Sequence, residues 1–478
     1  MTLKHWMRYF RPLLRGANSV SNSRLRGFTS QLTAMAKIIT LTNQEATLKQ
    51  LLLDVSAYIG TLEGCKKPEL RITGGWVRDK LLGLTSHDID IGIDTMTGFT
   101  FGNLMKQYLA LPETKAKYKQ DILGSLAKIE ANPEKSKHLE TVTTKILGLE
   151  IDLVNLRKET YTEDSRNPTM EFGTPGEDAL RRDATVNALF YNLDTSKVED
   201  FTGRGLKDME LEVIKTPLAP LQTFKDDPLR VLRSIRFASR LGYHIAEEDI
   251  DAMRDSSIKD ALKLKISRER VGVEVTKMLK GPNPYESLKL IDALGLYNDI
   301  FTQPTDPQCT TVETGHWHRA YNLLCRLMDR VRASSDEEKA DRHICAQILL
   351  RNSDDEFFAW MLVCFTPWAK VQSKSPKKQT TKRLPSSACI AAREGIKADN
   401  RVSNAVDDAV AHRHEIIAMK EAVMEEEKLR PSSLKRRQEA DLRVAQGLAI
   451  RRWGSRWRSS VMYALLVQVS EADLESGM

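Results

Sequence analysis

The segment that most constrains the fold of this 478-residue chain lies between residues 70 and 94 and combines a glycine pair with alternating aspartates. The short apolar stretch Leu70–Thr73 runs into Gly74 and Gly75, and a helix is expected from about Trp76. Because glycine lacks a Cβ atom, the backbone can approach an anion closely, and the first N–H groups of a helix can point toward it. The sequence therefore predicts a strand, a phosphate-binding turn and a helix.

A second strand is predicted where Asp88 and Asp90 alternate with Ile89 and Ile91. A period of two places both carboxylates on one face of the strand and both isoleucines on the other. Residues i and i+2 of a strand lie about 6–7 Å apart. Two carboxylates at this spacing can hold Mg²⁺ ions, which prefer oxygen ligands and nucleotide phosphates. Such ions can activate a hydroxyl and stabilise a leaving pyrophosphate.

Residues 147–156 alternate in the same way and predict another strand, which carries Asp152. The pattern leaves open whether Asp152 is a third acid of the site or a surface acid.

Arg181-Arg182-Asp183 is expected to open a helix, in which Asn187 lies on the same face as Asp183, four residues earlier. Two guanidinium groups at a helix start suit phosphate and ribose oxygens. Further along, Asp227 and Arg230 are expected on one helix. Their carboxylate and guanidinium can offer an acceptor and a donor fork to the edge of a nucleobase. The same helix continues with a basic stripe, for which phosphate contact and a solvated face are both open: Arg233, Arg236 and Arg240.

In this order, the segments resemble the five motifs of the class II tRNA nucleotidyltransferases, the CCA-adding enzymes of the polymerase β-like nucleotidyltransferase superfamily, in a eukaryotic or fungal form. Motifs A to E correspond to residues 71–94, 181–189, 200–209, 226–230 and 266–274. The chain departs from the family pattern at Met209 and at Asp226, which stands where motif D has glutamate. Motif C is expected to act as a hinge or neck, and motif E to be structural through charge pairing along its helix.

The resemblance implies template-independent addition of CCA to the 3′ end of tRNA from CTP and ATP, with Mg²⁺ as cofactor and release of pyrophosphate. Asp88, Asp90 and Asp152 would be catalytic, and Asp88 and Asp90 would hold the metal. The residues it assigns to nucleotide binding are Gly74, Gly75, Arg78, Arg181, Arg182, Asp183, Asn187, Asp227, Arg230, Arg233 and Arg236. A poly(A) polymerase, an enzyme that adds only CC or only A, and a catalytically silent tRNA-binding module are the alternatives.

The expected fold is α+β, with a small mixed-sheet head followed by an all-helical neck, body and tail. The boundaries expected are a nucleotidyltransferase head at 35–193, neck helices that select the nucleotide at 194–300, and a tRNA-binding body and tail at 301–478. No apolar run approaches 18 residues, so no membrane partner is expected. The sequence leaves open whether the chain is a monomer or a homodimer.

Residues 1–34 carry six arginines and lysines and no acid, together with several serines and apolar residues. This composition is typical of a mitochondrial transit peptide, although a basic RNA-binding arm would have the same charge. A second start at Met35 would give a cytoplasmic or nuclear form, and Thr42 and Glu45 have the spacing of a capping box that opens a helix.

Residues 371–460 carry 20 arginines and lysines against 11 acids, with tryptophans among the arginines at 451–458. Such a run suits an RNA backbone and stacked bases, or a basic helix that docks on the body through its tryptophans.

Overall fold

The computed structural model describes residues 39–86, 88–118, 122–124, 126–129, 141–162, 165–302, 311–333, 347–371, 384–428 and 433–471. The predicted transit peptide at 1–34 lies outside these residues. The described chain divides into two compact units. The head unit takes in residues up to 238 together with 242–258, and the helical unit takes in 239–241 and the residues from 259 onward.

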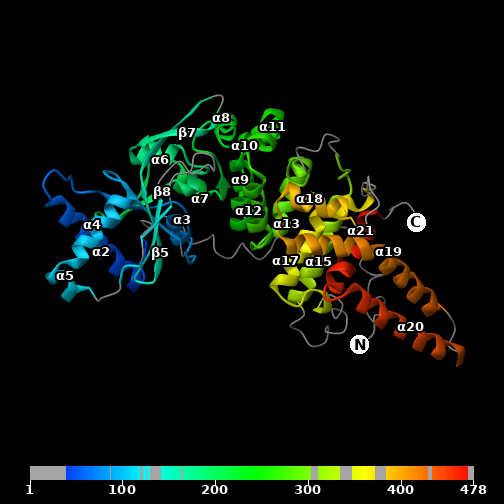
Figure 1. Cartoon of the computed structure of the whole chain (residues 1–478). Coiled ribbons are helices and arrows are strands. Elements are labelled where there is room, and N and C mark those ends of the chain that lie inside the picture. The colour runs from blue at the N-terminus through cyan, green and yellow to red at the C-terminus, as the bar shows by residue number, and fades with distance from the viewer. Residues whose placement is uncertain are drawn as a thin grey trace. The chain divides into compact units, whose positions relative to one another are not determined.

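A seven-stranded mixed sheet forms the centre of the head unit (Figure 1). The strands that are second and fifth along the chain, Asp88–Ile93 and Leu149–Asn155, pair in parallel. All other neighbouring strands of this sheet are antiparallel. In spatial order the strands are β3 (Ala127–Ile129), β4 (Thr141–Ile146), β5 (Leu149–Asn155), β2 (Asp88–Ile93), β1 (Leu70–Thr73), β8 (Leu189–Asn192) and β9 (Lys197–Asp200). The mixed-sheet head is thus confirmed, and β9 extends it past the expected end at residue 193.

The two faces of this sheet differ in polarity, as the alternating pattern predicts. Ile72, Ile91 and Leu153 occupy successive register positions and are buried. Helices α2 (Asn43–Gly60) and α4 (Gly98–Ala110) lie beside the sheet, and α4 approaches Leu153. The opposite register set contains Thr73, Asp90 and Asp152. The polar face is therefore left for the site.

The predicted capping box fixes the start of α2 and reaches into the next helix. Thr42 and Glu45 bond reciprocally, as expected. The Glu45 carboxylate also accepts hydrogen bonds from the Trp76 indole at 3.2 Å and from Lys80 at 2.6 Å. Trp76 and Lys80 belong to α3 (Gly75–Leu81), the helix that follows the glycine pair. Helix α2 therefore helps to hold α3 in place.

Beyond the sheet, the head unit continues with a hairpin and short helices. These elements are α5 (Pro112–Lys117), β6 (Arg157–Thr162), β7 (Ser165–Phe172), α6 (Pro175–Leu180), η4 (Thr185–Asn187), α7 (Gly205–Glu210), β10 (Val213–Ile214), α8 (Pro220–Asp226), α9 (Leu229–Leu241), β11 (His244–Ile245) and α10 (Glu247–Arg254). The last three residues of α9, and α11 (Ser256–Lys265) from residue 259, belong to the helical unit. The neck was expected to be all helical, but β10 and β11 pair as a small parallel sheet. The boundary between the units near residue 258 also divides the expected 194–300 neck.

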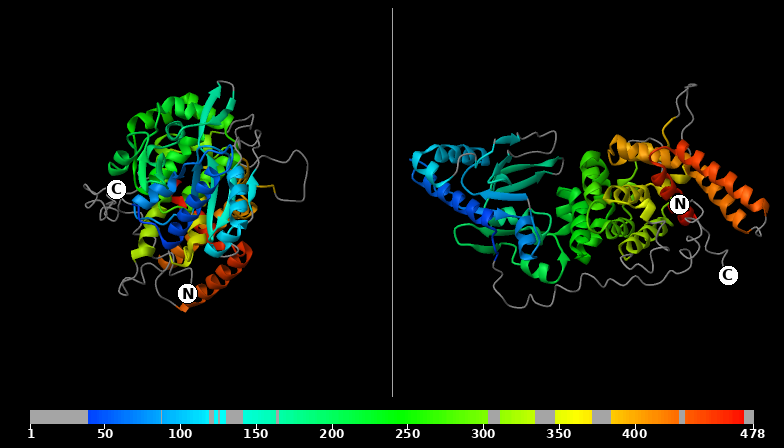
Figure 2. Two further views of the ribbon diagram at one scale, coloured as in Figure 1. Left: turned by 90° about the vertical axis from the view of Figure 1, so that its left-hand side faces the viewer. Right: turned by 90° about the horizontal axis from the view of Figure 1, so that it is seen from below.

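Helices make up the second unit. They are α12 (Arg268–Leu279), α13 (Pro284–Ala293), α14 (Tyr297–Ile300), α15 (Trp317–Ala333), α17 (Ser353–Cys364), η6 (Thr366–Lys370), α18 (Ser387–Gly395), α19 (Asn400–Lys428), α20 (Ser433–Trp453) and α21 (Trp457–Glu471). Residues 460–467 of α21 are buried on every side, which makes this helix the centre of the packing. Helices α19 and α20 lie side by side (Figure 2). No helix of the described chain is long and apolar enough to cross a bilayer.

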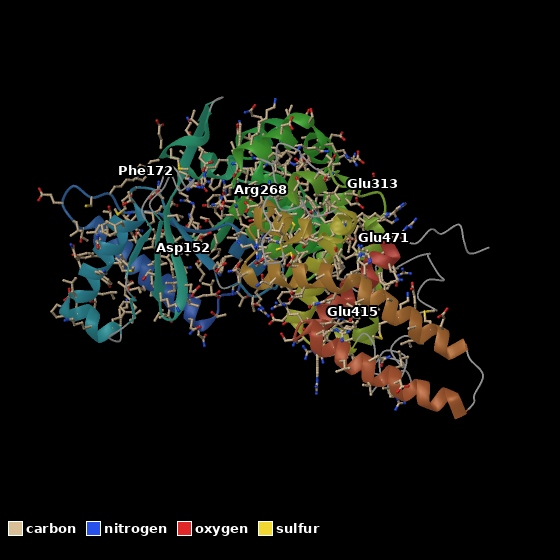
Figure 3. All side chains as sticks on the ribbon, turned by 45° about the vertical axis from the view of Figure 1, so that its right-hand side comes forward. Asp152, Phe172, Arg268, Glu313, Glu415 and Glu471 are labelled. Atoms are coloured by element: carbon tan, nitrogen blue, oxygen red, sulfur yellow. The ribbon has the colours of Figure 1, made fainter. Side chains whose placement is uncertain are left out.

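The expected structural role of motif E is carried by Arg268, at the first turn of α12 (Figure 3). Its guanidinium donates to the carbonyl oxygens of Gly395 at 2.6 Å and of Asp299 at 3.0 Å. Burial lowers the pKa of Arg268 to about 10. These hydrogen bonds go to main-chain carbonyls of distant segments, so Arg268 joins the helices of the unit in addition to any charge pairing along α12.

The basic and aromatic run at 451–458 docks on the unit. Trp453 is buried and donates its indole N–H to Glu415 of α19 at 2.8 Å. Arg456 forms an ion pair with Asp408 at 2.6 Å. These contacts agree with the expected docking of a basic helix through its tryptophans. Arg451 and Arg452 stay exposed on the same helix.

Two glycines of the helical unit make a matched stability test. A Cβ atom on Gly272, inside α12, would overlap the carbonyl oxygen of Ile396, whereas a Cβ on Gly447, inside α20, would meet no atom within 4 Å. We expect Gly272→Ala to destabilise the protein by about 2 kcal/mol or more through overpacking. Gly447→Ala should stabilise it by about 0.5–1 kcal/mol, because alanine favours helix. Thermal unfolding measures both, and equal melting temperatures would contradict this packing.

Candidate active site

The turn between β1 and α3 requires glycine at position 74. Gly74 has φ +75°, a conformation that residues with a Cβ rarely adopt. A Cβ atom here would lie 2.8 Å from Arg182 Nη1 and 3.9 Å from Asp90 Oδ2. Helix α3 begins at Gly75, and the Gly74 carbonyl accepts the N–H of Val77 at 3.2 Å, which closes the first turn. The predicted phosphate turn thus lies beside an arginine and a carboxylate.

The three predicted carboxylates belong to two adjacent parallel strands. Asp90 of β2 is in register with Asp152 of β5, and Asp88 stands exposed at the start of β2. Thr143, on the next strand, donates to Asp152 Oδ1 at 2.6 Å, which fixes one carboxylate oxygen (Figure 3 labels Asp152). The strand predicted at 147–156 is confirmed as β5, and it pairs directly with β2.

The electrostatics of Asp90 fit a site for a cation. Burial raises its pKa to about 6, the positive charge of Arg182 opposes this, and the charges of Asp152 and Asp88 add to it. Carboxylates that repel one another in this way, with oxygen as the only donor atom, suit Mg²⁺. The described residues contain no group of three acidic, histidine or cysteine side chains arranged as a ready metal site.

The arginine pair of motif B is held by an acid that the sequence analysis did not single out. Asp178 of α6, 1% exposed, accepts hydrogen bonds from Arg181 Nε at 2.9 Å and from Arg182 Nη2 at 2.8 Å. It also accepts the main-chain N–H of Arg157 at 3.3 Å. Although burial acts against it, the charges of Arg182 and Arg181 keep the pKa of Asp178 below its usual value. Asp178 precedes the two arginines by three and four residues, a helical spacing that would have allowed the sequence to predict these ion pairs.

A chain of polar contacts joins motifs A, B and D. Arg78, which is buried, donates to the side-chain oxygen of Asn187. Asn187 donates through Nδ2 to Asp183 Oδ1 at 3.1 Å, and Asp183 pairs with Arg233 of α9 at 2.5 Å. Burial opposes ionisation of Asp183, but Arg233 and the hydrogen bond from Asn187 lower its pKa to about 2. The four residues were all predicted as site residues, and the structure brings them together.

The base-reading pair predicted from motif D is arranged differently from expectation. Asp227 is extended, with φ −136° and ψ 95°, between α8 and α9, so it does not share a helix with Arg230. Its carboxylate accepts the N–H of Leu229 at 3.2 Å, because the chain must start a new helix there. Arg230 lies in the first turn of α9 and donates to the carbonyl of Arg181 at 2.7 Å. Arg236 follows on α9 and lies 4.3 Å from the Phe237 ring.

Motif B also differs from its expected local structure. The prediction that Arg181 and Arg182 open a helix is wrong, since α6 ends at Leu180 and Arg181 is its C-cap. Asn187 ends the single 3₁₀ turn η4, yet it still reaches Asp183. Sequence spacing therefore identified the contact but not the helix.

Glu159 on β6 is the second acid that sequence reasoning missed. Its side chain is 4% exposed and forms ion pairs with Arg157 at 2.9 Å, Arg181 at 3.1 Å and Arg230 at 3.7 Å. We call the group of four guanidiniums and two carboxylates formed by Arg157, Arg181, Arg182, Arg230, Asp178 and Glu159 the arginine cluster. Burial and then the charge of Arg181 lower the pKa of Arg157, as expected where cations are crowded. No local spacing signals the contacts of Glu159 with Arg181 and Arg230, because these two arginines are distant in sequence.

Comparison with known families assigns two parts of the chain. Residues 70–215 match the family described as "Poly A polymerase head domain". Residues 242–306 match the family described as "Probable RNA and SrmB-binding site of polymerase A". The first match contains the glycine turn, the carboxylates and the arginine pair.

Several curated proteins are similar over much of their length. Nucleotidyltransferase lcsQ of Purpureocillium lilacinum is 43% identical, and the alignment covers 92% of this chain and 73% of that protein. The tRNA nucleotidyltransferase cca1 of Schizosaccharomyces pombe is 36% identical, and the alignment covers 93% of this chain and 83% of that protein. A "CCA tRNA nucleotidyltransferase, mitochondrial" of Candida glabrata is 52% identical over 58% of this chain and 52% of that protein.

Among solved structures, the Thermotoga maritima CCA-adding enzyme complexed with tRNA has a similar fold. The TM-score is 0.54 at 20% identity, and the match covers 90% of this chain and 83% of the other. The likeness supports the arrangement of a mixed-sheet head followed by helices.

The Arg233–Asp183 pair gives a pH prediction. Because the folded pKa of Asp183 is depressed to about 2, its stabilising contribution is complete above the unfolded pKa of about 4 and is lost as the pH falls toward 2. Replacing Arg233 by methionine should raise the pKa of Asp183 and move acid unfolding to higher pH, which circular dichroism between pH 5 and 2 measures. Arg254→Met, at an exposed position of α10, is the control. Identical acid midpoints for the two variants would contradict the pairing.

Proposed function

The chain belongs to the tRNA nucleotidyltransferases, and from this premise we propose that it adds CCA to the 3′ end of tRNA, using CTP and ATP and releasing pyrophosphate. The observation that carries the proposal is the polar chain from Arg78 through Asn187 and Asp183 to Arg233. It joins the glycine-turn helix, the arginine pair and the α9 helix into one site.

The reaction is an in-line displacement in which the 3′ hydroxyl of tRNA attacks the α-phosphorus and the bond to pyrophosphate breaks. Mg²⁺ held by Asp88 and Asp90, with Asp152 beside them, would supply the positive charge that activates the hydroxyl and stabilises the leaving group. Gly74 and Gly75 leave room for the triphosphate, and Arg182 lies next to that room. Donors that the protein itself holds in place need little reorganisation when charge develops on phosphate.

Base selection is assigned to Asp227 and Arg230. A guanidinium and a carboxylate offer a donor fork and an acceptor that can pair with the edges of cytosine and adenine. Arg230 is 8% exposed and is already held by the Arg181 carbonyl, so its fork has a defined direction. In this proposal, these two side chains replace a nucleic-acid template.

The helical unit is proposed to bind the tRNA body. Helix α20 exposes Arg443, Arg451 and Arg452, together with Val444 and Leu448, which are 62% and 50% exposed. Cationic and apolar groups on one helix suit a phosphate backbone and exposed bases. Recognition is expected to depend on the shape of the acceptor stem more than on its sequence.

Enzymes of this family that make poly(A), or add only CC or only A, would share the head described here. The relatives named for tRNA or CCA addition favour the complete reaction. A silent tRNA-binding module would have no use for three carboxylates on two adjacent strands beside a glycine turn.

The proposal is tested with the chain that begins at Met35 and with tRNAs that end before CCA, after C and after CC. Each labelled nucleotide is supplied alone and in combination with Mg²⁺. We expect C on the first two substrates, A only on the third, and no further extension. Continued addition of A, arrest after CC, or addition of U and G at comparable rates would each reject it.

Removing Asp90 should separate catalysis from tRNA binding. Asp90→Ala is expected to lower nucleotide incorporation by roughly a thousandfold or more, as loss of a charge-stabilising group does. Affinity for tRNA should change less than about twofold, since the tRNA contacts lie elsewhere. Filter binding and single-turnover rates measure the two effects.

Glu150→Ala is the matched control for this variant. Glu150 lies on the neighbouring strand in register with Asp88, and its side chain is 62% exposed. Its removal should leave the rate nearly unchanged. Equal rates for the wild type and Asp90→Ala would remove Asp90 from the reaction.

We also propose that residues 1–34 direct the longer form to mitochondria and that a start at Met35 gives a second, cytoplasmic or nuclear form. The Candida glabrata relative named as mitochondrial supports the mitochondrial localisation. Fluorescent fusions of residues 1–34 alone and of the chain from Met35 test both localisations. Cytoplasmic fluorescence from the 1–34 fusion would reject the transit peptide.

A further inference from the structure

We infer that Glu159 is a positioning residue that directs Arg230 toward the nucleobase and so contributes to the choice of nucleotide. The inference rests on the proposed function. Glu159 lies outside all five motifs and outside the segments that the sequence predicts to be functional.

The contacts of Glu159 divide between its two oxygens. Oε1 faces Arg157 at 2.9 Å and Arg181 at 3.1 Å, and Oε2 faces Arg230 at 3.7 Å. One buried carboxylate of β6 therefore meets guanidiniums from its own strand, from the end of α6 and from the start of α9. Among the described residues, Glu159 links the arginine pair of motif B to the arginine of motif D.

The guanidinium of Arg230 is held from a second direction. Nη2 donates to the carbonyl oxygen of Arg181 at 2.7 Å, and the side chain is buried. A planar fork fixed by an ion pair and by a carbonyl loses most of its freedom to rotate. The direction of its remaining donors is then set by the protein and not by the bound nucleotide.

Asp227 is differently engaged. Its carboxylate accepts the N–H of Leu229, which stabilises the start of α9. Glu159 faces the Arg230 guanidinium from a separate element, the strand β6. If Glu159 is neutralised, Arg230 loses an attraction that burial makes strong, and its fork can turn.

The expected consequence is loss of selectivity greater than loss of binding. In Glu159→Gln, the ratio of kcat/KM for CTP to that for UTP should fall by about tenfold, because the Arg230 fork loses the carboxylate that faces it at 3.7 Å. KM for CTP should change less, because the glycine turn and Arg182 still contact phosphate. Glu159→Asp keeps the charge but withdraws it from Arg230, so the ratio should fall by a smaller factor with near-normal thermal stability.

A double-mutant cycle with Arg230→Ala separates positioning from a structural role. If Glu159 acts through Arg230, Glu159→Gln changes the CTP-to-UTP ratio in the wild type but not in the Arg230→Ala background. Glu171→Gln is the matched control, because Glu171 is exposed on the other strand of the same hairpin. It should leave the ratio unchanged.

The experiment uses the full chain and adds calorimetric titration with CTP and UTP in the absence of tRNA. Should the wild type fail to add C and A to tRNA, the proposed function fails, and the nucleotide-binding preference still decides the role of Glu159. An unchanged CTP-to-UTP preference in folded Glu159→Gln, or equal effects of Glu159→Gln with and without Arg230, would overturn the inference. If Glu159→Gln does not fold, the test uses Glu159→Asp. An unaltered ratio of kcat/KM for CTP to that for UTP in Glu159→Asp would also overturn the inference.

Discussion

The head of this protein depends on the burial of two carboxylates among four arginines. Asp178 and Glu159 are the anions of the arginine cluster, and each contacts more than one guanidinium. A buried acid left without such partners would be costly, and so would an arginine left without an acid. Because the arginines come from β6, the end of α6 and α9, the cluster fixes these elements relative to one another within the head unit.

The same balance of charge organises the chemistry. Arg182 of motif B and Asp90 of β2 both lie close to Gly74, and Asp152 of β5 is in register with Asp90. Burial raises the pKa of Asp90, and the charges of Asp152 and Asp88 add to this shift while Arg182 opposes it. A metal–nucleotide complex carries both complementary charges, so a single ligand satisfies both halves of the site. This complementarity explains why the glycine turn lies where it does.

Much of this arrangement was predictable from sequence, because it follows from residue types that recur every two residues in a strand or every three to four residues in a helix. Alternation at residues 88–91 predicted β2 and its face, and the spacing of Thr42 and Glu45 predicted the capping box. The helices expected at Arg181 and across Asp227 were wrong, because a spacing of three or four residues also brings side chains together in turns. The role of Glu159 could not be predicted from sequence, because its contact with Arg230 of α9 forms only when β6 and α9 come together in the folded head unit. Asp178 was within reach, because the relevant arginines follow it at helical spacing.

In the proposed function the protein itself replaces the template, with the triphosphate on the glycine turn and the base at the start of α9. A crystal structure of the chain with CTP and Mg²⁺ is the direct test. We expect phosphate oxygens beside Gly74, Gly75 and Arg182, the metal on Asp88 and Asp90, and the cytosine edge against Asp227 and Arg230. A cytosine edge that meets neither Asp227 nor Arg230, with the triphosphate in place, would contradict it.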